Sequence, residues 1–494
     1  MKTMIGRNWD KRGVEEGRIS PLCKMENNLE STELTLTKEQ QDIVDYTGNE
    51  ILIRGIAGSG KTLVLLKKAK QTALKYPNEK VAIFTFAGTL SNATKLLIEK
   101  YNLNNLEVKT FHSWAMSTYP KVMKKKFYLT KGKQQDGFLK KAIQNLSSLK
   151  HRFVNNEDFF DFLKDEIQWI KGKGISTLNE YLEVNRRGRG TNTRVTMNDR
   201  EIIYQVFDQY NKEKDYLLDF DDAAVVLMNF KDKFPDSIKY DHIFIDEAQD
   251  LQQVQLQVLK HIAKESFIVA ADKGQKIYKT SFTWKEIGLN VTGNRTKILK
   301  DSYRSTKQII QLAASLQQKD SVIYDEEYVI PTLPEKEGPI PYLMKCKTAE
   351  AQDKEIIKSV KKILEKTPDC TIGILYREGA SRNSAKYRIQ RALNEAGLPS
   401  EDIRDNGNPH TPGIKLCTFH SAKGLEFDFV FIIDLVEPTR IPDEDKEENY
   451  WEIERRLLYV SITRARVHLH LFTYGNVLRL IKELDSDLYK SFTL

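Results

Sequence analysis

Short apolar runs alternate with longer amphipathic stretches along most of the chain. The apolar runs are rich in isoleucine, valine and phenylalanine, and the stretches between them repeat apolar residues at helical spacing. This alternation is typical of domains built on a parallel sheet flanked by helices. The expected buried strands are 50–54, 81–86, 242–245, 267–271, 371–376, 414–419, 429–435 and 467–472. The pattern therefore predicts an α/β fold with two parallel-sheet domains in tandem.

The pattern changes between Trp114 and about Asp219, where the chain is charged and mostly helical. We interpret 115–218 as a helical insertion in a first domain spanning 34–295, and 296–494 as the second domain. Residues 1–33 mix charges with glycine and lack the apolar core of a secretory signal, so we expect a disordered leader. Met1 and Met25 both remain candidate starts.

Composition narrows the class of protein. Charged residues make up 30% and hydrophobic residues 40%, and no apolar run is long enough to span a membrane, so we expect a cytoplasmic protein without a membrane partner. The four cysteines are far apart, which excludes a disulfide framework and a zinc ribbon. Lysine plus arginine exceeds aspartate plus glutamate by 77 − 69 = 8. This excess fits solubility as well as nucleic-acid binding. The basic run 121–126 is likewise either solvated charge or a guide for phosphates.

A glycine-rich segment directly follows the first expected strand. It matches the pattern G-x-x-x-x-G-K-[ST], in which backbone N–H groups converge on phosphate oxygens and the next helix adds its dipole. Lys61 is expected to reach the β- and γ-phosphates of ATP, and the Thr62 hydroxyl to ligate Mg²⁺. The nucleotide-binding residues predicted in this segment are Gly55, Ala57, Gly58, Ser59, Gly60, Lys61 and Thr62.

A pair of carboxylates ends the expected strand 242–245. Asp246 is predicted to hold the Mg²⁺, and Glu247 to orient and deprotonate the attacking water. Neighbouring carboxylates repel each other, and a divalent cation relieves that repulsion. Together with the phosphate-binding segment, this pair predicts an ATP-hydrolysing enzyme.

Further segments resemble the motifs of superfamily 1 DNA helicases of the UvrD/Rep/PcrA group. They follow one another along the chain in the same order as the motifs of that group. The segments are Leu36–Gln40 (LTKEQ), Thr110–Ser113 (TFHS), Leu218–Asp222 (LDFDD), Asp272–Tyr278 (DKGQKIY), Ser302–Thr306 (SYRST), Thr418–Phe427 (TFHSAKGLEF) and Arg455–Ala465 (RRLLYVSITRA). The resemblance implies that both domains are RecA-like P-loop NTPase domains with ATP sandwiched between them.

The resemblance also assigns residues to the nucleotide. It implies that Gln40 contacts the adenine edge and that Tyr303 stacks on the adenine. It implies that Gln275 senses the γ-phosphate, and that Arg304 and Arg464 contact it from the second domain. Arg464 corresponds to the arginine finger of that group. Gly424 and Glu426 complete the implied nucleotide site.

For DNA, the resemblance implies aromatic stacking and phosphate contacts that tolerate any sequence. The implied nucleic-acid residues are Phe86, Thr110, His112, Tyr278, Trp284, Thr418 and His420. A purely structural role stays open for Phe86, His112 and Trp284. The resemblance further implies 3′→5′ movement on single-stranded DNA, with a 3′-tailed duplex as the substrate to unwind and ATP as the sole small-molecule substrate.

The chain departs from the group in several places. Gly397-Leu-Pro399 is followed by the strand 414–419 after a short connection, where the group carries a regulatory subdomain called 2B. We therefore expect a compact form without it, in which processive unwinding is in doubt. Two other functions stay open: an RNA-directed ATPase of superfamily 1, and a nucleotide-responsive regulatory subunit of a nuclease or another defence or repair protein.

Overall fold

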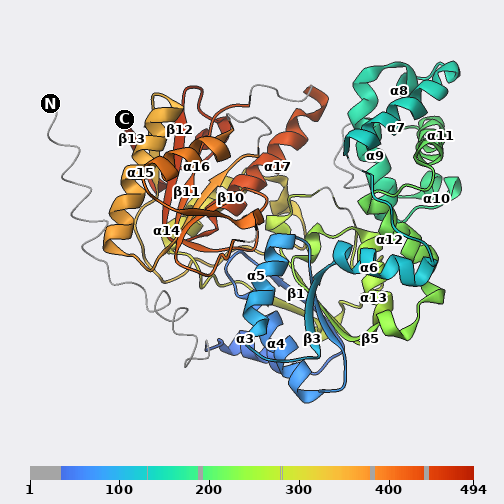
Figure 1. Cartoon of the computed structure of the whole chain (residues 1–494), viewed down its shortest axis with the longest axis horizontal. Helices are drawn as coiled ribbons and strands as arrows, with labels where there is room; N and C mark the ends of the chain where they lie inside the picture. The colour runs from blue at the N-terminus through green and yellow to red at the C-terminus, as the bar shows by residue number, and fades with distance from the viewer. Residues whose placement is uncertain are drawn as a thin grey trace.

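The computed structural model describes residues 35–130, 132–186, 193–278, 280, 282–378, 384–405, 407–438 and 444–494. The expected leader therefore lies outside the described residues. Two parallel sheets form the frame, as the apolar runs predict, and Figure 1 shows the two sheet domains side by side with a helical unit set apart from both. None of the described helices combines the length and the apolar character needed to cross a bilayer.

The first sheet has the strand order β3-β2-β4-β5-β1-β6, and its paired strands are all parallel. Its strands are β1 Glu50–Gly55, β2 Val81–Thr85, β3 Leu106–Thr110, β4 Tyr240–Ile245, β5 Ala263–Ala271 and β6 Thr296–Leu299. The helices around it are α3 Lys38–Asp45, α4 Lys61–Lys75, α5 Gly88–Glu99, α6 Phe111–Met123, α12 Phe220–Asn229 and α13 Gln253–Ile262. Apolar clusters fill both faces of the sheet, which explains why its strands are nearly continuous apolar runs.

Two boundaries differ from the prediction. Strand β6 pairs with β1, so the segment from residue 296 still belongs to the first sheet rather than opening the second domain. Trp114 and Ala115 lie in the core of the first sheet, so the insertion has its own core only from α7 onward. Both errors concern short or amphipathic segments in which hydrophobic periodicity does not identify the packing partner.

The insertion is a helical unit with a separate apolar core, drawn in teal and green in Figure 1. Its helices are α7 Gly132–Asn145, α8 Arg152–Asn155, α9 Phe160–Lys173, α10 Leu178–Glu183 and α11 Met197–Lys214. Two buried lysines tie the unit to the start of α12. Lys171 lies 2.5 Å from Asp219 Oδ2 and 2.7 Å from Asp222 Oδ1, and Lys214 pairs with the same two carboxylates. Asp219 and Asp222 of the LDFDD segment therefore have a structural role in this buried ion cluster.

The second sheet has the order β13-β7-β12-β11-β8-β10-β9. Its strands are β7 Tyr342–Cys346, β8 Thr371–Tyr376, β9 Ser400–Asp402, β10 Gly413–Thr418, β11 Phe427–Ile432, β12 Ala465–Tyr474 and β13 Lys490–Thr493. Its helices are α14 Lys307–Gln317, α15 Ala349–Lys366, α16 Ala385–Glu395 and α17 Glu444–Ile462. Between β9 and β10 the described chain forms only the short 3₁₀ turn Ile403–Asp405, which leaves no room for an added subdomain.

A buried histidine makes the second domain sensitive to acid. His470 on β12 is 3% exposed and stacks on Phe431, with ring centroids 4.8 Å apart. Burial lowers the pKa of His470 to about 3, so below the unfolded-state value of about 6.5 the unfolded chain binds a proton that the folded chain does not. Stability is therefore lost as the pH falls below about 6.5.

We expect the parent to lose about 2 kcal/mol more unfolding free energy than His470→Phe between pH 7 and pH 5. Calorimetric unfolding of the second domain at both pH values measures this difference. The control His261→Phe, at an exposed position, should follow the parent. Equal acid sensitivity of the parent and His470→Phe contradicts the neutral, buried imidazole.

Candidate nucleotide and nucleic-acid sites

The phosphate-binding segment lies between β1 and α4, as predicted, and depends on glycine at two positions. Gly58 and Gly60 have φ of 76° and 84°, a region that residues with a side chain rarely occupy. A Cβ on Gly58 would lie 2.7 Å from Ser302 Oγ, and one on Gly60 would lie 2.5 Å from Gln40 Nε2. The backbone of the segment therefore packs closely against the side chains of Ser302 and Gln40, which belong to two other predicted motifs.

Lys61 and Thr62 reach the acidic end of the sheet. Lys61 Nζ donates to the carbonyl oxygens of Gly55 (3.1 Å) and Ile56 (2.8 Å) and lies 3.2 Å from Asp272 Oδ2. Thr62 Oγ1 donates to Asp246 Oδ2 at 2.7 Å. The structure thus brings together the two segments that the sequence predicted to act jointly, although 184 positions separate Thr62 from Asp246.

The Asp246–Glu247 pair is buried and electrostatically divided. Burial and the charge of Glu247 raise the pKa of Asp246. Burial alone would raise the pKa of Glu247 as well, but Lys423, Lys61 and Arg464 together lower it. Glu247 also has a left-handed backbone, with φ of 53°, a conformation that costs about 1–3 kcal/mol in a residue other than glycine. A carboxylate kept ionised in a strained turn suits a group that orients water.

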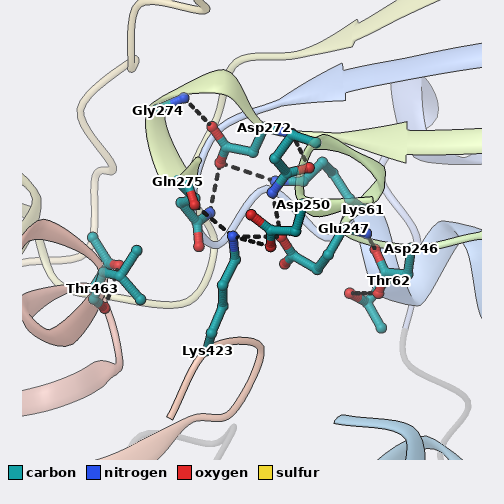
Figure 2. Close-up of polar contacts among 12 residues, drawn as sticks. Lys61, Thr62, Asp246, Glu247, Asp250, Asp272, Gly274, Gln275, Lys423 and Thr463 are labelled. Atoms are coloured by element: carbon teal, nitrogen blue, oxygen red, sulfur yellow. Dashed lines mark hydrogen bonds and ion pairs between the residues drawn. The ribbon is translucent and has the colours of Figure 1, made fainter. Parts of the chain in front are cut away.

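A chain of polar contacts joins the two domains at this site (Figure 2). Lys61 contacts Asp272, and Gln275 Nε2 donates to the same Asp272 Oδ2 at 2.5 Å. From the second domain, Arg464 Nη2 donates to Gln275 Oε1 at 2.8 Å. Burial and the nearby Arg304 lower the pKa of Arg464 to about 10, so the guanidinium is charged at neutral pH. Lys61 of the first domain and Arg464 of the second domain are therefore linked through Asp272 and Gln275.

Lys423 is a second contact across the domains, and it is not among the site residues predicted from the sequence. Its ammonium lies 2.5 Å from Asp250 Oδ2 and 3.6 Å from Glu247 Oε2, and it donates to the carbonyl oxygen of Gln275 (Figure 2). The signal was present, because Lys423 lies inside the HSAKGLEF segment. Its partner Asp250 was not identifiable without the fold.

The remaining nucleotide candidates lie around the same segment. Arg304 pairs with Glu426, and that ion pair counteracts burial and lowers the pKa of Glu426. Tyr303 is 43% exposed, and its backbone N–H donates to the Gly58 carbonyl oxygen at 2.9 Å. Gln40 Nε2 donates to the Ser59 carbonyl oxygen at 3.0 Å. Gly424 abuts Leu90 of α5, where a Cβ would lie 2.8 Å from the leucine side chain.

The donor set fits a magnesium ion shared with phosphates. Within the described ranges, no group of three or more His, Cys, Asp or Glu side chains could hold a metal by itself. Thr62 and Asp246 offer a hydroxyl and a carboxylate oxygen in contact with each other. Mg²⁺ in nucleotide enzymes takes one or two such ligands and completes its shell with phosphates and water. Buried Asp246 and Glu247 would both gain from its charge.

A groove of about 660 Å³ runs between the first sheet domain and the insertion. Four predicted nucleic-acid residues line it: Phe86, Thr110, His112 and Tyr278. The rings of Phe86 and Tyr278 lie 4.5 Å apart, both half-buried. Burial lowers the pKa of His112, so its imidazole is neutral at pH 7. The groove therefore offers aromatic faces and polar groups, with charged side chains of both signs also in its lining.

The other nucleic-acid candidates divide into two kinds. His420 is exposed, and its ring lies 6.1 Å from that of Tyr278, so it extends the same aromatic row from the second domain. Thr418 is 2% exposed and donates to Ser421 Oγ at 2.9 Å, so its contribution is to shape the turn. Trp284 is wrong as a stacking residue, because it is 4% exposed within the core of the first sheet.

Phe220 is a groove residue that the prediction missed. Its ring is 46% exposed and lies 5.1 Å from the His112 ring, edge to face. It belongs to the LDFDD segment, which was noted only as a resemblance. An exposed phenylalanine beside the predicted nucleic-acid residues is the structural signal, and the sequence alone does not reveal exposure.

The protein has two parallel-sheet domains, and polar contacts from both of them meet beside one glycine-rich segment. A family model described as the UvrD/REP helicase N-terminal domain matches residues 36–283, and one for the UvrD-like helicase C-terminal domain matches 383–476. The chain belongs to the UvrD/REP helicase family, a family of ATP-hydrolysing enzymes.

Named relatives extend over much of the chain. A probable DNA helicase of Mycoplasma pneumoniae is 24% identical over 479 residues, covering 88% of this chain and 83% of the relative. The ATP-dependent DNA helicase Rep of Buchnera aphidicola is 26% identical over 398 residues, covering 74% and 57%. PcrA of Bacillus subtilis is 26% identical over 311 residues, covering 58% and 40%. The chain thus spans about half the length of Rep and PcrA.

Proposed function

We propose that the chain is an ATP-dependent DNA helicase or translocase that moves 3′→5′ on single-stranded DNA and hydrolyses ATP between its two sheet domains. The observation that carries the proposal is the chain of contacts from Arg464 through Gln275 and Asp272 to Lys61. It joins a cation of each domain at one phosphate-binding segment. The names of the Rep and PcrA relatives support the choice of DNA over RNA.

The side chains of this site divide the work of hydrolysis among them. Lys61, at the start of α4, neutralises charge on the outer phosphates, while ionised Glu247 holds the attacking water. Thr62 and Asp246 would hold Mg²⁺, which supplies charge neutralisation at the phosphates when bound. Arg464 and Arg304 add positive charge from the second domain as negative charge develops. Such positioning of cations accounts for most of the catalysis in phosphoryl transfer.

The site is connected to the groove through a short stretch of backbone. Gln275 contacts Arg464, and Tyr278, three positions later, contacts Phe86 and His420. Lys423 of the second domain donates to the Gln275 carbonyl oxygen. Because these residues lie between the domains, opening and closing around ATP moves the aromatic row. That coupling is what stepping along a strand requires.

ATP turnover with different polymers tests the proposal. We expect poly-dT to stimulate ATP hydrolysis more strongly than poly-U, and a 3′-tailed duplex to be displaced in preference to a 5′-tailed one. Equal stimulation by poly-U would favour an RNA-directed enzyme. Rapid hydrolysis without translocation or displacement, with or without a co-purified partner, would favour a regulatory subunit instead.

Phe86→Ala tests the aromatic row of the groove. Removing the ring should weaken binding of single-stranded DNA by about tenfold, since a base stacked on an aromatic side chain contributes about 1–3 kcal/mol. Nucleotide affinity should change little, because Phe86 makes no contact with the phosphate-binding segment among the contacts described for it. Fluorescence anisotropy with labelled dT oligonucleotides measures the DNA affinity of Phe86→Ala. Phe86→Tyr, which keeps the ring, is the matched control. Unchanged DNA affinity of Phe86→Ala rejects the stacking role.

A further inference from the structure

Two tyrosines are exposed where the first domain meets the insertion. Tyr128, shortly after α6, is 50% exposed, and Tyr216, shortly after α11, is 66% exposed. Their rings lie edge to face with centroids 5.7 Å apart. Tyrosine is enriched at interfaces, because its ring offers an apolar face and its hydroxyl a polar tip. Neither residue takes part in the site described above.

The backbone holds this pair in place. The Leu218 N–H donates to the Tyr128 carbonyl oxygen at 2.9 Å, and the Thr130 N–H donates to the Leu218 carbonyl oxygen at 2.8 Å. These two bonds form a parallel bridge between Leu129 and Leu218. The rings are therefore presented by paired backbone rather than by a loose loop.

Positive charge closely precedes Tyr128 along the chain. Lys124, Lys125 and Lys126 are exposed, and none of them makes an ion pair with a residue for which the structure gives a position. Exposed Asp215, next to Tyr216, offsets one of the three charges. We call these three lysines together with Tyr128 and Tyr216 the Tyr128–Tyr216 surface.

The surface is close to residues that line the groove. Phe220 lines the groove and follows Tyr216 by four positions, a reach of at most about 14 Å. Gln135 also lines the groove, and its Nε2 donates to Thr130 Oγ1 at 3.0 Å, beside the bridge that carries Tyr128. The Tyr128–Tyr216 surface is therefore within reach of a strand that leaves the groove past Phe220.

We infer that the single strand of DNA bound in the groove continues over the Tyr128–Tyr216 surface, where bases stack on the two tyrosines and phosphates pair with the three lysines. This inference rests on the proposed function. Exposed rings beside lysines are the combination that binds single strands without sequence preference. A duplex would use the lysines alone, because its bases are already stacked and its contacts are mainly to phosphates.

Binding of dT oligonucleotides of two lengths tests the inference on the full chain. One of about 8 nucleotides should fill the groove alone, and one of about 20 should also cover the surface. The Tyr128→Ala/Tyr216→Ala variant should bind the longer oligonucleotide about tenfold more weakly and the shorter one like the parent. The Tyr128→Phe/Tyr216→Phe variant keeps both rings and should match the parent with both.

The lysines are tested by salt dependence. Lys124→Asn, Lys125→Gln and Lys126→Gln together should reduce the slope of log affinity against log salt by about 2 for the longer oligonucleotide, since each neutralised phosphate contributes about 0.7. Asparagine is chosen at position 124 because that residue has φ of 56° and asparagine tolerates a positive φ. The rate of ATP turnover at saturating DNA should stay at the parental value in every variant.

Parental binding of the longer oligonucleotide by both the alanine and the lysine variants overturns the inference. So does a loss confined to the lysine variant and to duplex DNA, which would make the surface a duplex contact. Both results leave the proposed function standing. A parent chain whose ATP turnover no DNA stimulates is the separate result that rejects the proposed function and the inference together.

Discussion

Arg464→Ala should lower the rate of ATP turnover by about 10³-fold or more at saturating DNA and ATP. The guanidinium is buried, charged, and bonded to Gln275 at the edge of the phosphate site, and an arginine finger is worth about 10³–10⁵ in rate. Nucleotide affinity should change far less, because the binding segment with Lys61 belongs to the other domain. Steady-state turnover and equilibrium binding of a fluorescent ATP analogue separate the two effects.

Two further variants distinguish a loss of the guanidinium group from a folding defect. Arg464→Lys keeps a charge but loses the two-pronged guanidinium, so it should fold like the parent and still turn over ATP slowly. Arg391→Ala removes a 75%-exposed arginine of the second domain and should turn over ATP like the parent. A normal rate for Arg464→Ala contradicts the account of the site.

Glu247→Gln should abolish most ATP turnover while leaving ATP bound. General-base catalysis contributes about 10²–10⁴ in rate, and the amide cannot accept the proton of the attacking water. Losing a negative charge beside Asp246 also removes repulsion toward the phosphates, so ATP affinity should be retained or improved. Single-turnover hydrolysis together with ATP binding measures both quantities.

The matched control for this variant is Glu265→Gln, an exposed glutamate on β5 of the same domain, which should behave like the parent. A Glu247→Gln variant that hydrolyses ATP at the parental rate would falsify the role of Glu247. Loss of ATP binding instead would assign the residue to the binding of the metal rather than to the water.

The sequence predicted the frame of the site well because the information is local. Buried parallel strands are nearly continuous apolar runs, so the strand 371–376 was predicted with the bounds that β8 has. Lys61 and Thr62 were identifiable because the turn before α4 needs glycines at fixed positions. That Lys61 and Arg464 belong to one site was predicted only through the resemblance. No local pattern specifies the contact between Gln275 and Arg464, which lie 189 positions apart in the sequence.

The missed features depend on tertiary packing. The strands β3, β6, β7, β9 and β13 were not predicted, because they span only three to five residues and lack a continuous run of β-branched apolar residues. Trp284 was assigned to DNA although it packs in the core, and Phe220 was overlooked although its ring faces the groove. An aromatic side chain serves equally well in a core and in a stacking surface, so its exposure decides its role, and exposure is a property of the fold.

The distance between the two domains tests the central claim most directly. Spin labels at exposed Lys75→Cys on α4 and Glu395→Cys on α16 place one probe on each domain, with Cys23→Ser to avoid a third label; Cys346, Cys370 and Cys417 are buried. Pulsed dipolar spectroscopy on this chain should give one shorter, narrower distance with Mg²⁺ and a non-hydrolysable ATP analogue than with ADP, and the difference should vanish in an additional Arg464→Ala change. The same distance distribution with both nucleotides contradicts a triphosphate gripped from both sides.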